Sequence, residues 1–307
     1  MLSRATLEVE IGLDEGSRAN LEGPHPFSVA GCVVLFDGDR DRVRKVVIAG
    51  SVPKWKNAIP SQVESVLEAF EATQARSLVR IFERTEDGVR RLKETIDQAI
   101  RQEKAVAEQA QLFLKDPGFD RSPEGLFHLM LFASVSPLLY KASVEEVIRT
   151  LPKTFIDVVR VAFSVYIDRY DAPETHLKAV RGAFSRYAKA ERRGYNNLPR
   201  IEFEFRGADL AKESEQPSLI LVDHLSGIVA SQTIPGYRLP AGLRDAPVAA
   251  WYDRLARHPR FQILKRKIET LIPEVQAAEA TGRDLVKQAK ALKADVLKEP
   301  RDGGGPS

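Results

Sequence analysis

Cysteine is almost absent from this chain, since Cys32 is the single one among 307 residues. An intramolecular disulfide is therefore excluded. A zinc site is disfavoured as well, because the five histidines are scattered along the sequence. Cys32 lies within the apolar stretch Val29–Leu35, so we expect a buried structural thiol rather than a nucleophile.

Long hydrophobic runs are also missing. No stretch approaches the roughly 20 apolar residues of a membrane span, and the first residues lack the apolar centre of a secretory signal. Hydrophobic residues make up 43% of the chain and charged residues 29%, which is typical of a soluble globular protein. We therefore expect a cytoplasmic protein with no membrane partner.

Several catalytic signatures are missing too. The sequence holds no glycine-rich phosphate loop of the Walker type and no Gly-x-Gly-x-x-Gly after an expected strand. It also lacks the nucleophile elbow of Ser-His-Asp hydrolases. These absences disfavour nucleotide-dependent enzymes and serine hydrolases.

Positive charge is only slightly in excess over negative charge, with a net charge of +3. The basic residues gather in clusters, among them Arg192-Arg193 and Lys265-Arg266-Lys267. Solvated helix faces explain most such clusters, while contact with nucleic acid phosphates stays open for each of them.

Alternating and apolar stretches predict the first half of the fold. Residues 5–14 alternate apolar and polar side chains as a half-buried strand does. We expect two more strands at 27–36 and 43–52, separated by a turn at Asp37-Gly38-Asp39, so that residues 5–52 form a three-stranded antiparallel meander. A helix follows at 60–75, and a fourth strand is favoured at 77–83.

The second half alternates helices with strands. Residues 87–151 look helical, and strands are expected at 155–168 and 200–206. The other expected helices span 173–193, 218–232, 247–257, 260–272 and 274–298. The fold class is therefore α/β, a mixed sheet with helices on it. We expect one domain over residues 1–235 with a helical insertion at about 87–151, a C-terminal helical extension over 236–298, and a disordered tail over 299–307.

Three acidic residues stand at the ends of expected strands or in apolar surroundings. Asp14 closes the first strand, Asp168 closes the strand at 155–168, and Asp223 interrupts the apolar run Leu219–Leu225. They would converge if the first strand and the Asp168 strand are neighbours and the 218–232 helix packs beside them. Clustered carboxylates need a cation or a shared proton, and Mg²⁺ or Mn²⁺ prefers such oxygen ligands.

The same stretches resemble a known family. Leu13-Asp14-Glu15-Gly16-Ser17 resembles the Asp-Glu-Ser-Gly motif that opens the family named domain of unknown function 3800, and the apolar run from Phe27 follows as it does there. Val165-Tyr166-Ile167-Asp168 resembles the family's middle strand, and the helix from Ser218 to Ala230 resembles its last helix. The serine is displaced by Gly16, and Leu219 or a neighbour stands where the family has glutamine.

This resemblance implies a ribonuclease-H-like fold and a metal-dependent nuclease that hydrolyses phosphodiester bonds. It implies that Asp14 bridges the metals, with Asp168 and Asp223 as further ligands. Glu15 is then a supporting catalytic residue, and Asp171 is an alternative to Asp168. The implied cofactor is Mg²⁺ or Mn²⁺, and the implied partner is nucleic acid, RNA or DNA.

Structural explanations stay open for each carboxylate. Asp14-Glu15-Gly16 fits a polar turn, and Asp223 fits a buried salt bridge. Asp168 fits a helix cap or a plain strand end, and Asp171 is the better candidate for the cap. Two other functions also stay open, namely a non-catalytic interaction protein that self-associates through its helical regions and a protein that binds nucleic acid without cleaving it.

Overall fold

The computed structural model describes residues 4–15, 27–48, 50–83, 158–168, 200–211 and 216–267, with isolated positions between 85 and 94 and between 138 and 188. The strands are β1 (Arg4–Glu15), β2 (Phe27–Phe36), β3 (Arg76–Glu83), β4 (Val158–Asp168), β5 (Arg200–Ala211) and β6 (Phe261–Lys267). The helices are α1 (Asp37–Val47), α2 (Pro60–Glu71), α7 (Pro217–Thr233) and α8 (Val248–Ala256), with single 3-10 turns at Trp55–Asn57 and Ala241–Leu243.

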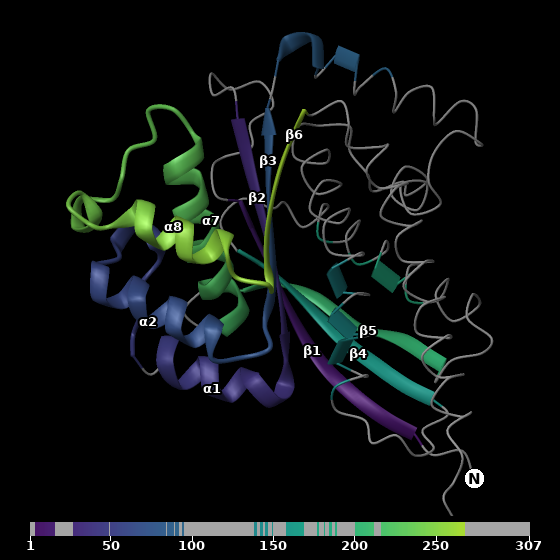
Figure 1. Cartoon of the computed structure of the whole chain (residues 1–307). Helices are drawn as coiled ribbons and strands as arrows, with labels where there is room; N and C mark the ends of the chain where they lie inside the picture. Colours follow the sequence, from purple (N-terminus) through teal and green to yellow (C-terminus); the bar gives the residue numbers. More distant parts are fainter. Residues whose placement is uncertain are drawn as a thin grey trace, which may run out of the picture.

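The six strands form one mixed sheet in the order β5-β4-β1-β2-β3-β6. β2 runs antiparallel to both β1 and β3, whereas β4 is parallel to β1, β5 to β4 and β6 to β3. The expected fold class is confirmed: a three-stranded antiparallel meander continues into further strands of a mixed α/β sheet. In Figure 1, α1, α2, α7 and α8 gather on the same side of this sheet.

The third strand of the meander was predicted in the wrong place. Residues 37–47 form α1, so the expected turn at Asp37–Asp39 and the expected strand at 43–52 are both wrong. The acidic first turn and the basic Arg44 and Lys45 in the last turn suit a helix dipole, and Val43 and Val47 lie buried one turn apart. The meander is completed by β3, the segment expected as a fourth strand.

The basic segment at 261–267 is also a strand rather than part of the helix expected over 260–272. β6 pairs with β3 along its whole length, so it joins the core sheet. The expected division of the chain at residue 235 stays a prediction. The expected helix at 274–298 and the tail at 299–307 lie outside the described residues, as do most of 87–151 and of the helix at 173–193.

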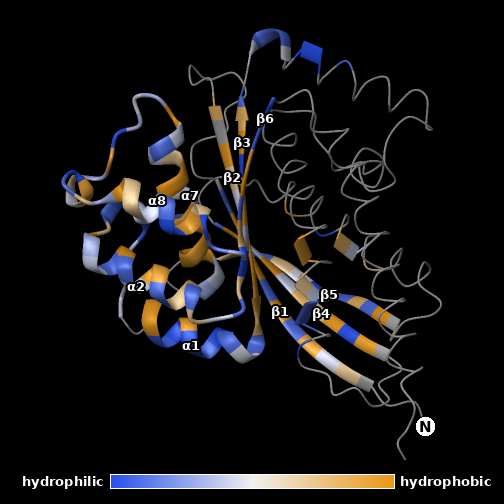
Figure 2. Ribbon diagram, viewed as in Figure 1, coloured by the Kyte–Doolittle hydropathy of each residue, from blue (hydrophilic) through white to orange (hydrophobic). Residues whose placement is uncertain are grey.

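Helix α7 forms the centre of the core between the sheet and the other helices. It is apolar nearly all round, as Figure 2 shows, and such a helix is stable only when it is buried. It lies directly on β2, because a Cβ atom at Gly31 would come within 2.0 Å of the Ser226 hydroxyl and 2.6 Å of Val222. The absence of a side chain at Gly31 therefore lets α7 approach β2, the strand that pairs with β1.

A second layer of apolar side chains covers the opposite face of the sheet. Val9, Ile11 and Leu13 of β1 are buried there, on the side away from α7. Four phenylalanines continue this layer: Phe163, Phe184, Phe203 and Phe205, with ring centroids 5.4–6.4 Å apart. Cys32 is fully buried in β2, and burial raises the pKa of its thiol far above the ordinary value, which confirms the prediction of a structural thiol.

Candidate functional site

Two of the predicted carboxylates lie at the same end of neighbouring parallel strands. The register pairs Leu13 of β1 with Ile167 of β4, so Asp14 and Asp168 follow at the same level. Adjacent strands are about 4.8 Å apart, and residues at one level point to the same face. Leu13 and Ile167 point away from α7, which places both carboxylates on the face that α7 covers. Asp14 is only 5% exposed.

The third carboxylate belongs to the helix that covers this face. Asp14 pairs with Gly31 across β1 and β2, and residues Val222 and Ser226 of α7 lie against Gly31. Asp223 is therefore in the turn of α7 that lies over this part of the sheet. The structure meets both conditions for convergence, since β1 and β4 are neighbours and α7 packs beside them.

The connection between α1 and α2 holds two of these carboxylates. The Lys54 ammonium donates to Asp168 Oδ2 at 2.7 Å, and the backbone N–H of Trp55 donates to Asp223 Oδ2 at 2.6 Å. Two consecutive residues thus reach one carboxylate on β4 and one on α7. We refer to them as the Lys54–Trp55 segment.

The electrostatics show that Asp223 and Asp168 share one neighbourhood. Burial raises the pKa of Asp223 above its ordinary value, and the charge of Asp168 raises it further. The neighbouring His224, the Trp55 N–H and Lys54 act in the opposite direction.

The charges of the carboxylates also affect Tyr237. Burial raises the pKa of Tyr237, and the charges of Asp223 and Asp14 add to that effect, although the hydrogen bond from Trp55 opposes it. The Tyr237 hydroxyl accepts this bond from the Trp55 indole N–H at 3.0 Å. Tyr237 therefore lies within reach of both carboxylates and belongs to the site.

His224 is a structural residue beside the site. It is fully buried, and its Nδ1–H donates to the carbonyl oxygen of Ile220 at 3.0 Å, one turn earlier in α7. Burial lowers the pKa of His224, which keeps its ring neutral at physiological pH. The ring also meets Trp55 edge to face at 6.0 Å between centroids, so it helps to position the Lys54–Trp55 segment.

The remaining predicted residues are less fully defined. Glu15 ends β1, with its backbone paired to Ala30 of β2. Asp171 lies outside the described residues. Sequence reasoning missed Lys54, Trp55 and Tyr237, because no motif marks them and their role depends on contacts with residues more than 100 positions away.

The carboxylates of this site supply part of the ligand set that a divalent cation needs. Carboxylate oxygens are the ligands that Mg²⁺ and Mn²⁺ prefer, and magnesium sites use one or two carboxylates completed by water and substrate phosphate. Among the described residues, no three His, Cys, Asp or Glu side chains are placed to hold a metal ion together. The residues fit an open site of the one- or two-carboxylate kind and do not form a closed cage.

Comparisons with known proteins add little to this geometry. No protein-family model matches the chain, and no curated protein matches it. Among solved structures it is similar to ribonuclease H2 from Pyrococcus horikoshii OT3, at 12% identity and a TM-score of 0.31 over 90% of this chain and 99% of that one. A superposition this loose transfers neither residues nor activity. In the described part of the chain, no helix is long and apolar enough to cross a membrane.

Proposed function

We propose that this protein is a metal-dependent nuclease on a ribonuclease-H-like core, related to the domain of unknown function 3800 family, that hydrolyses phosphodiester bonds in nucleic acid. The observation that carries the proposal is the placement of Asp14 and Asp168 at one level of two parallel strands, under the helix that bears Asp223. Carboxylates of such low exposure need a cationic partner, and nuclease chemistry supplies a use for one.

In this proposal the chain supplies ligands and positioning. Asp14 and Asp223 would hold Mg²⁺ or Mn²⁺, which when bound supplies an activated water and neutralises charge on the phosphate. The Trp55 N–H keeps Asp223 oriented through its Oδ2 atom, which leaves Oδ1 available to a ligand. Lys54 holds Asp168 in the same way.

A basic strand supports nucleic acid as the substrate. Lys265, Arg266 and Lys267 are exposed on β6, and Lys265 lies 5.1 Å above the centre of the Phe27 ring. β6 is three strands from β1 and runs in the same direction. The C-terminal ends of the two strands therefore lie at the same end of the sheet, and the basic end of β6 is about 14 Å or more from Asp14. That distance corresponds to about four nucleotides at the rise of ~3.4 Å per nucleotide of a duplex strand.

Substitution of each carboxylate by its amide tests the proposal. Purified wild type and the D14N, D168N and D223N variants are incubated with labelled single-stranded and duplex RNA and DNA in Mg²⁺, Mn²⁺ or chelator. We expect wild-type cleavage only with metal, and a loss of about 100-fold or more in D14N and D223N. The control is D253N, since Asp253 is exposed on α8 away from the site. Equal cleavage by wild type and D14N would contradict the proposal.

Nucleic acid binding without cleavage is the second candidate. The observation that favours it is the ammonium of Lys54 on Asp168, because a carboxylate already paired with lysine is a weaker metal ligand. This alternative predicts affinity for nucleic acid that falls steeply with salt and does not change with chelator. A K265E variant would weaken such binding, whereas D14N would leave it unchanged.

A further inference from the structure

A tight turn directly after α7 fixes the backbone of Tyr237. The Tyr237 N–H closes this turn by donating to the carbonyl oxygen of Ile234 at 3.2 Å. Pro235 and Gly236 lie between them, and Gly236 has a φ of 74°, the left-handed conformation that the third position of a type II turn requires. The chain therefore leaves α7 in one defined direction, which sets the place from which the Tyr237 side chain starts.

The hydroxyl group of Tyr237 is held in place by a bond that it accepts. Its donor is the indole N–H of Trp55, at 3.0 Å. That indole is itself fixed, because Trp55 is 4% exposed and packs so closely on α7 that a Cβ atom at Gly227 would come within 2.5 Å of the ring. An indole N–H donates and cannot accept, so the hydroxyl proton of Tyr237 must be directed elsewhere. Among the described residues, none accepts this proton.

This unused donor lies beside the carboxylates of the site. Trp55 joins the two, since its indole N–H reaches Tyr237 and its backbone N–H donates to Asp223 Oδ2 at 2.6 Å. Burial raises the pKa of Tyr237, and the charges of Asp223 and Asp14 raise it further, which shows that both carboxylates are near the phenol. At neutral pH the phenol therefore keeps its proton and is an uncharged donor.

We propose that Tyr237 is a substrate-binding residue of this site, whose hydroxyl donates a hydrogen bond to a non-bridging oxygen of the nucleic acid phosphate, with Trp55 as its positioning residue. This inference rests on the proposed nuclease function and adds a contact that does not depend on which carboxylates hold an ion. A phosphodiester has two non-bridging oxygens, and an oxygen that is not on a cation needs hydrogen-bond donors. A hydroxyl bonded to an anionic oxygen is among the stronger hydrogen bonds of proteins.

Equilibrium binding tests the assignment without any measurement of cleavage. The full-length chain is titrated into a short fluorescein-labelled single-stranded DNA or RNA, and fluorescence anisotropy gives the affinity. Ca²⁺ is the ion present, since it takes oxygen ligands as Mg²⁺ does. We expect Y237F to bind about tenfold more weakly than wild type, because a hydrogen bond to a charged oxygen is lost. The matched control is Y252F, which should stay within about twofold of wild type, since Tyr252 is also half-buried but lies on α8.

Two further measurements separate a substrate contact from a purely structural role. The lost hydroxyl is uncharged, so Y237F should leave the salt dependence of the affinity unchanged. Calorimetry with Mn²⁺ should show less than about a threefold change in Y237F, because the hydroxyl acts on the phosphate. If Tyr237 only held Trp55, the loss would release Asp223 and weaken Mn²⁺ binding about tenfold or more.

A second variant covers the case in which Y237F does not fold in a thermal unfolding control. O-methyltyrosine at position 237 keeps the oxygen that accepts the Trp55 N–H and lacks only the proton. It should weaken nucleic acid binding as Y237F does and leave Mn²⁺ binding unchanged.

Each outcome decides the assignment. Equal nucleic acid affinity of wild type and Y237F, or parallel losses of nucleic acid and Mn²⁺ affinity, would overturn the role of Tyr237. Failure of the nuclease proposal looks different: a wild type that binds nucleic acid more tightly than Y237F and cleaves none leaves the Tyr237 assignment intact. Metal-dependent cleavage with equal affinity and equal rates in both proteins would give the reverse result. A wild type that binds no nucleic acid would overturn both.

Discussion

Glu10 of β1 accepts two hydrogen bonds from Ser218 at the start of α7. The Glu10 Oε1 atom receives the backbone N–H at 3.0 Å and the hydroxyl at 2.6 Å, and both residues are buried. The first N–H groups of a helix have no partner within the helix, and a carboxylate there also suits the helix dipole. This contact fixes α7 on the strand that bears Asp14, four residues further along.

Replacement of Glu10 by alanine is therefore expected to destabilise the fold. The change leaves two buried donors of Ser218 without an acceptor, and each such group costs about 1–3 kcal/mol. We expect E10A to lose about 2–4 kcal/mol of unfolding free energy and E10Q to lose less, because its amide oxygen still accepts. Urea unfolding followed by circular dichroism measures both.

Glu8 provides the matched control on the same strand and face. Its ion pair with Arg206 is 3.6 Å long and both side chains are 48% exposed, so E8A should change stability by less than about 0.5 kcal/mol. Equal effects of E8A and E10A would show that the Glu10–Ser218 contact does not hold the helix.

The sequence pattern predicted the alternating strand and the long apolar strands, and it failed in short apolar or basic runs. β1, β2, β4 and α2 lie close to their expected bounds. The run Val46-Val47-Ile48 was assigned to a strand, but it ends a helix whose apolar face is only Val43 and Val47 wide. The segment at 261–267 was assigned to a helix because its lysines and arginine look solvated, whereas its partner strand β3 imposes an extended form. Short apolar and basic runs carry too little periodicity to decide between the two.

The candidate site was predictable only in its acidic members. Asp14, Asp168 and Asp223 stand out because each interrupts or ends an apolar pattern. Lys54 and Trp55 follow α1 in a connection with no pattern of its own, and their contacts join residues 114 and 168 positions away. Such pairings depend on the strand order, which local sequence does not encode. The metal-ligand roles of the three carboxylates stay predictions.

Gly227 is expected to tolerate no side chain. A methyl group there would lie 2.5 Å from the Trp55 indole, well inside van der Waals contact, and both the helix and the ring are held by other bonds. We expect G227A to cost about 1–3 kcal/mol, as overpacking does elsewhere, and to displace the Lys54–Trp55 segment. Thermal unfolding measures the loss, and the near-ultraviolet signal of Trp55 and Trp251 reports the displacement.

Gly38 is the control for this change. It also lies in a helix, α1, but nothing comes within 4 Å of a Cβ atom at that position. G38A should stabilise the protein by about 0.5–1 kcal/mol through the higher helix propensity of alanine. A similar change in stability from both substitutions would mean that the Trp55 ring moves away from the new methyl group at little cost in free energy.

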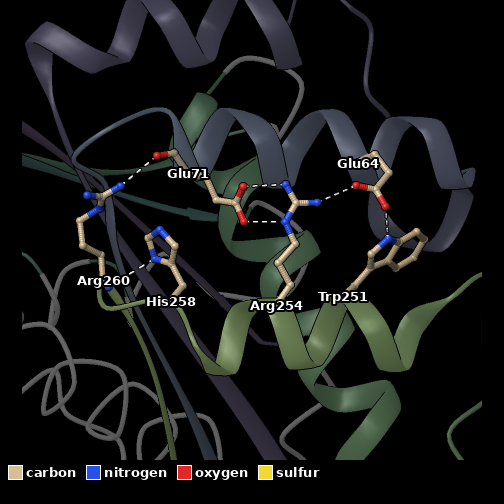
Figure 3. A network of polar contacts seen from close by, with 6 residues as sticks. All are labelled: Glu64, Glu71, Trp251, Arg254, His258 and Arg260. Carbon is tan, nitrogen blue, oxygen red and sulfur yellow. Dashed lines mark hydrogen bonds and ion pairs between the residues drawn. The ribbon is translucent and has the colours of Figure 1, made fainter.

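Arg254 joins α8 to α2 through two glutamates, as Figure 3 shows. Its guanidinium forms two bonds of 2.6 Å with Glu71 and one of 2.8 Å with Glu64, and Glu64 also accepts the indole N–H of Trp251. The side chains of Arg254 and Glu71 are about one third exposed, which moderates the energy. A double-mutant cycle on Arg254 and Glu71 should give a coupling of about 1 kcal/mol that decreases with salt.

The control cycle uses Arg257 and Asp253 on the same helix. That pair is 3.9 Å apart and exposed, with fractions of 82% and 61%, so its coupling should be near zero. R254K should resemble R254A more closely than wild type, because an ammonium cannot form the paired bonds to Glu71. Equal coupling in the two cycles would contradict a specific role for the bidentate contact.

The stability of the protein is expected to fall in mild acid because of His258. Burial lowers the pKa of His258, the charges of Arg260 and Arg254 lower it further, and Glu71 acts in the opposite direction. The unfolded chain therefore binds this proton at a higher pH than the folded protein does. The stability that depends on neutral His258 is fully present above the pKa of the unfolded chain, about 6.5. It is lost as the pH falls from there through the lower pKa of the folded protein. Urea unfolding between pH 7.5 and 5.0 should show this decline in the free energy of unfolding.

An asparagine at this position separates His258 from the other titrating groups. The His258 Nδ1 atom accepts the backbone N–H of Arg260 at 3.3 Å, and the ring lies 5.1 Å from Phe70 between centroids. The asparagine side chain retains an acceptor near Nδ1 but carries no titratable proton. H258N should therefore lose some stability at pH 7.5 through the missing ring contact and should decline less steeply in acid. His224 also has a lowered pKa and is unchanged in the variant, so the free energy of unfolding is still expected to fall somewhat with falling pH. A slope identical to that of wild type would show that His258 does not contribute to the acid sensitivity.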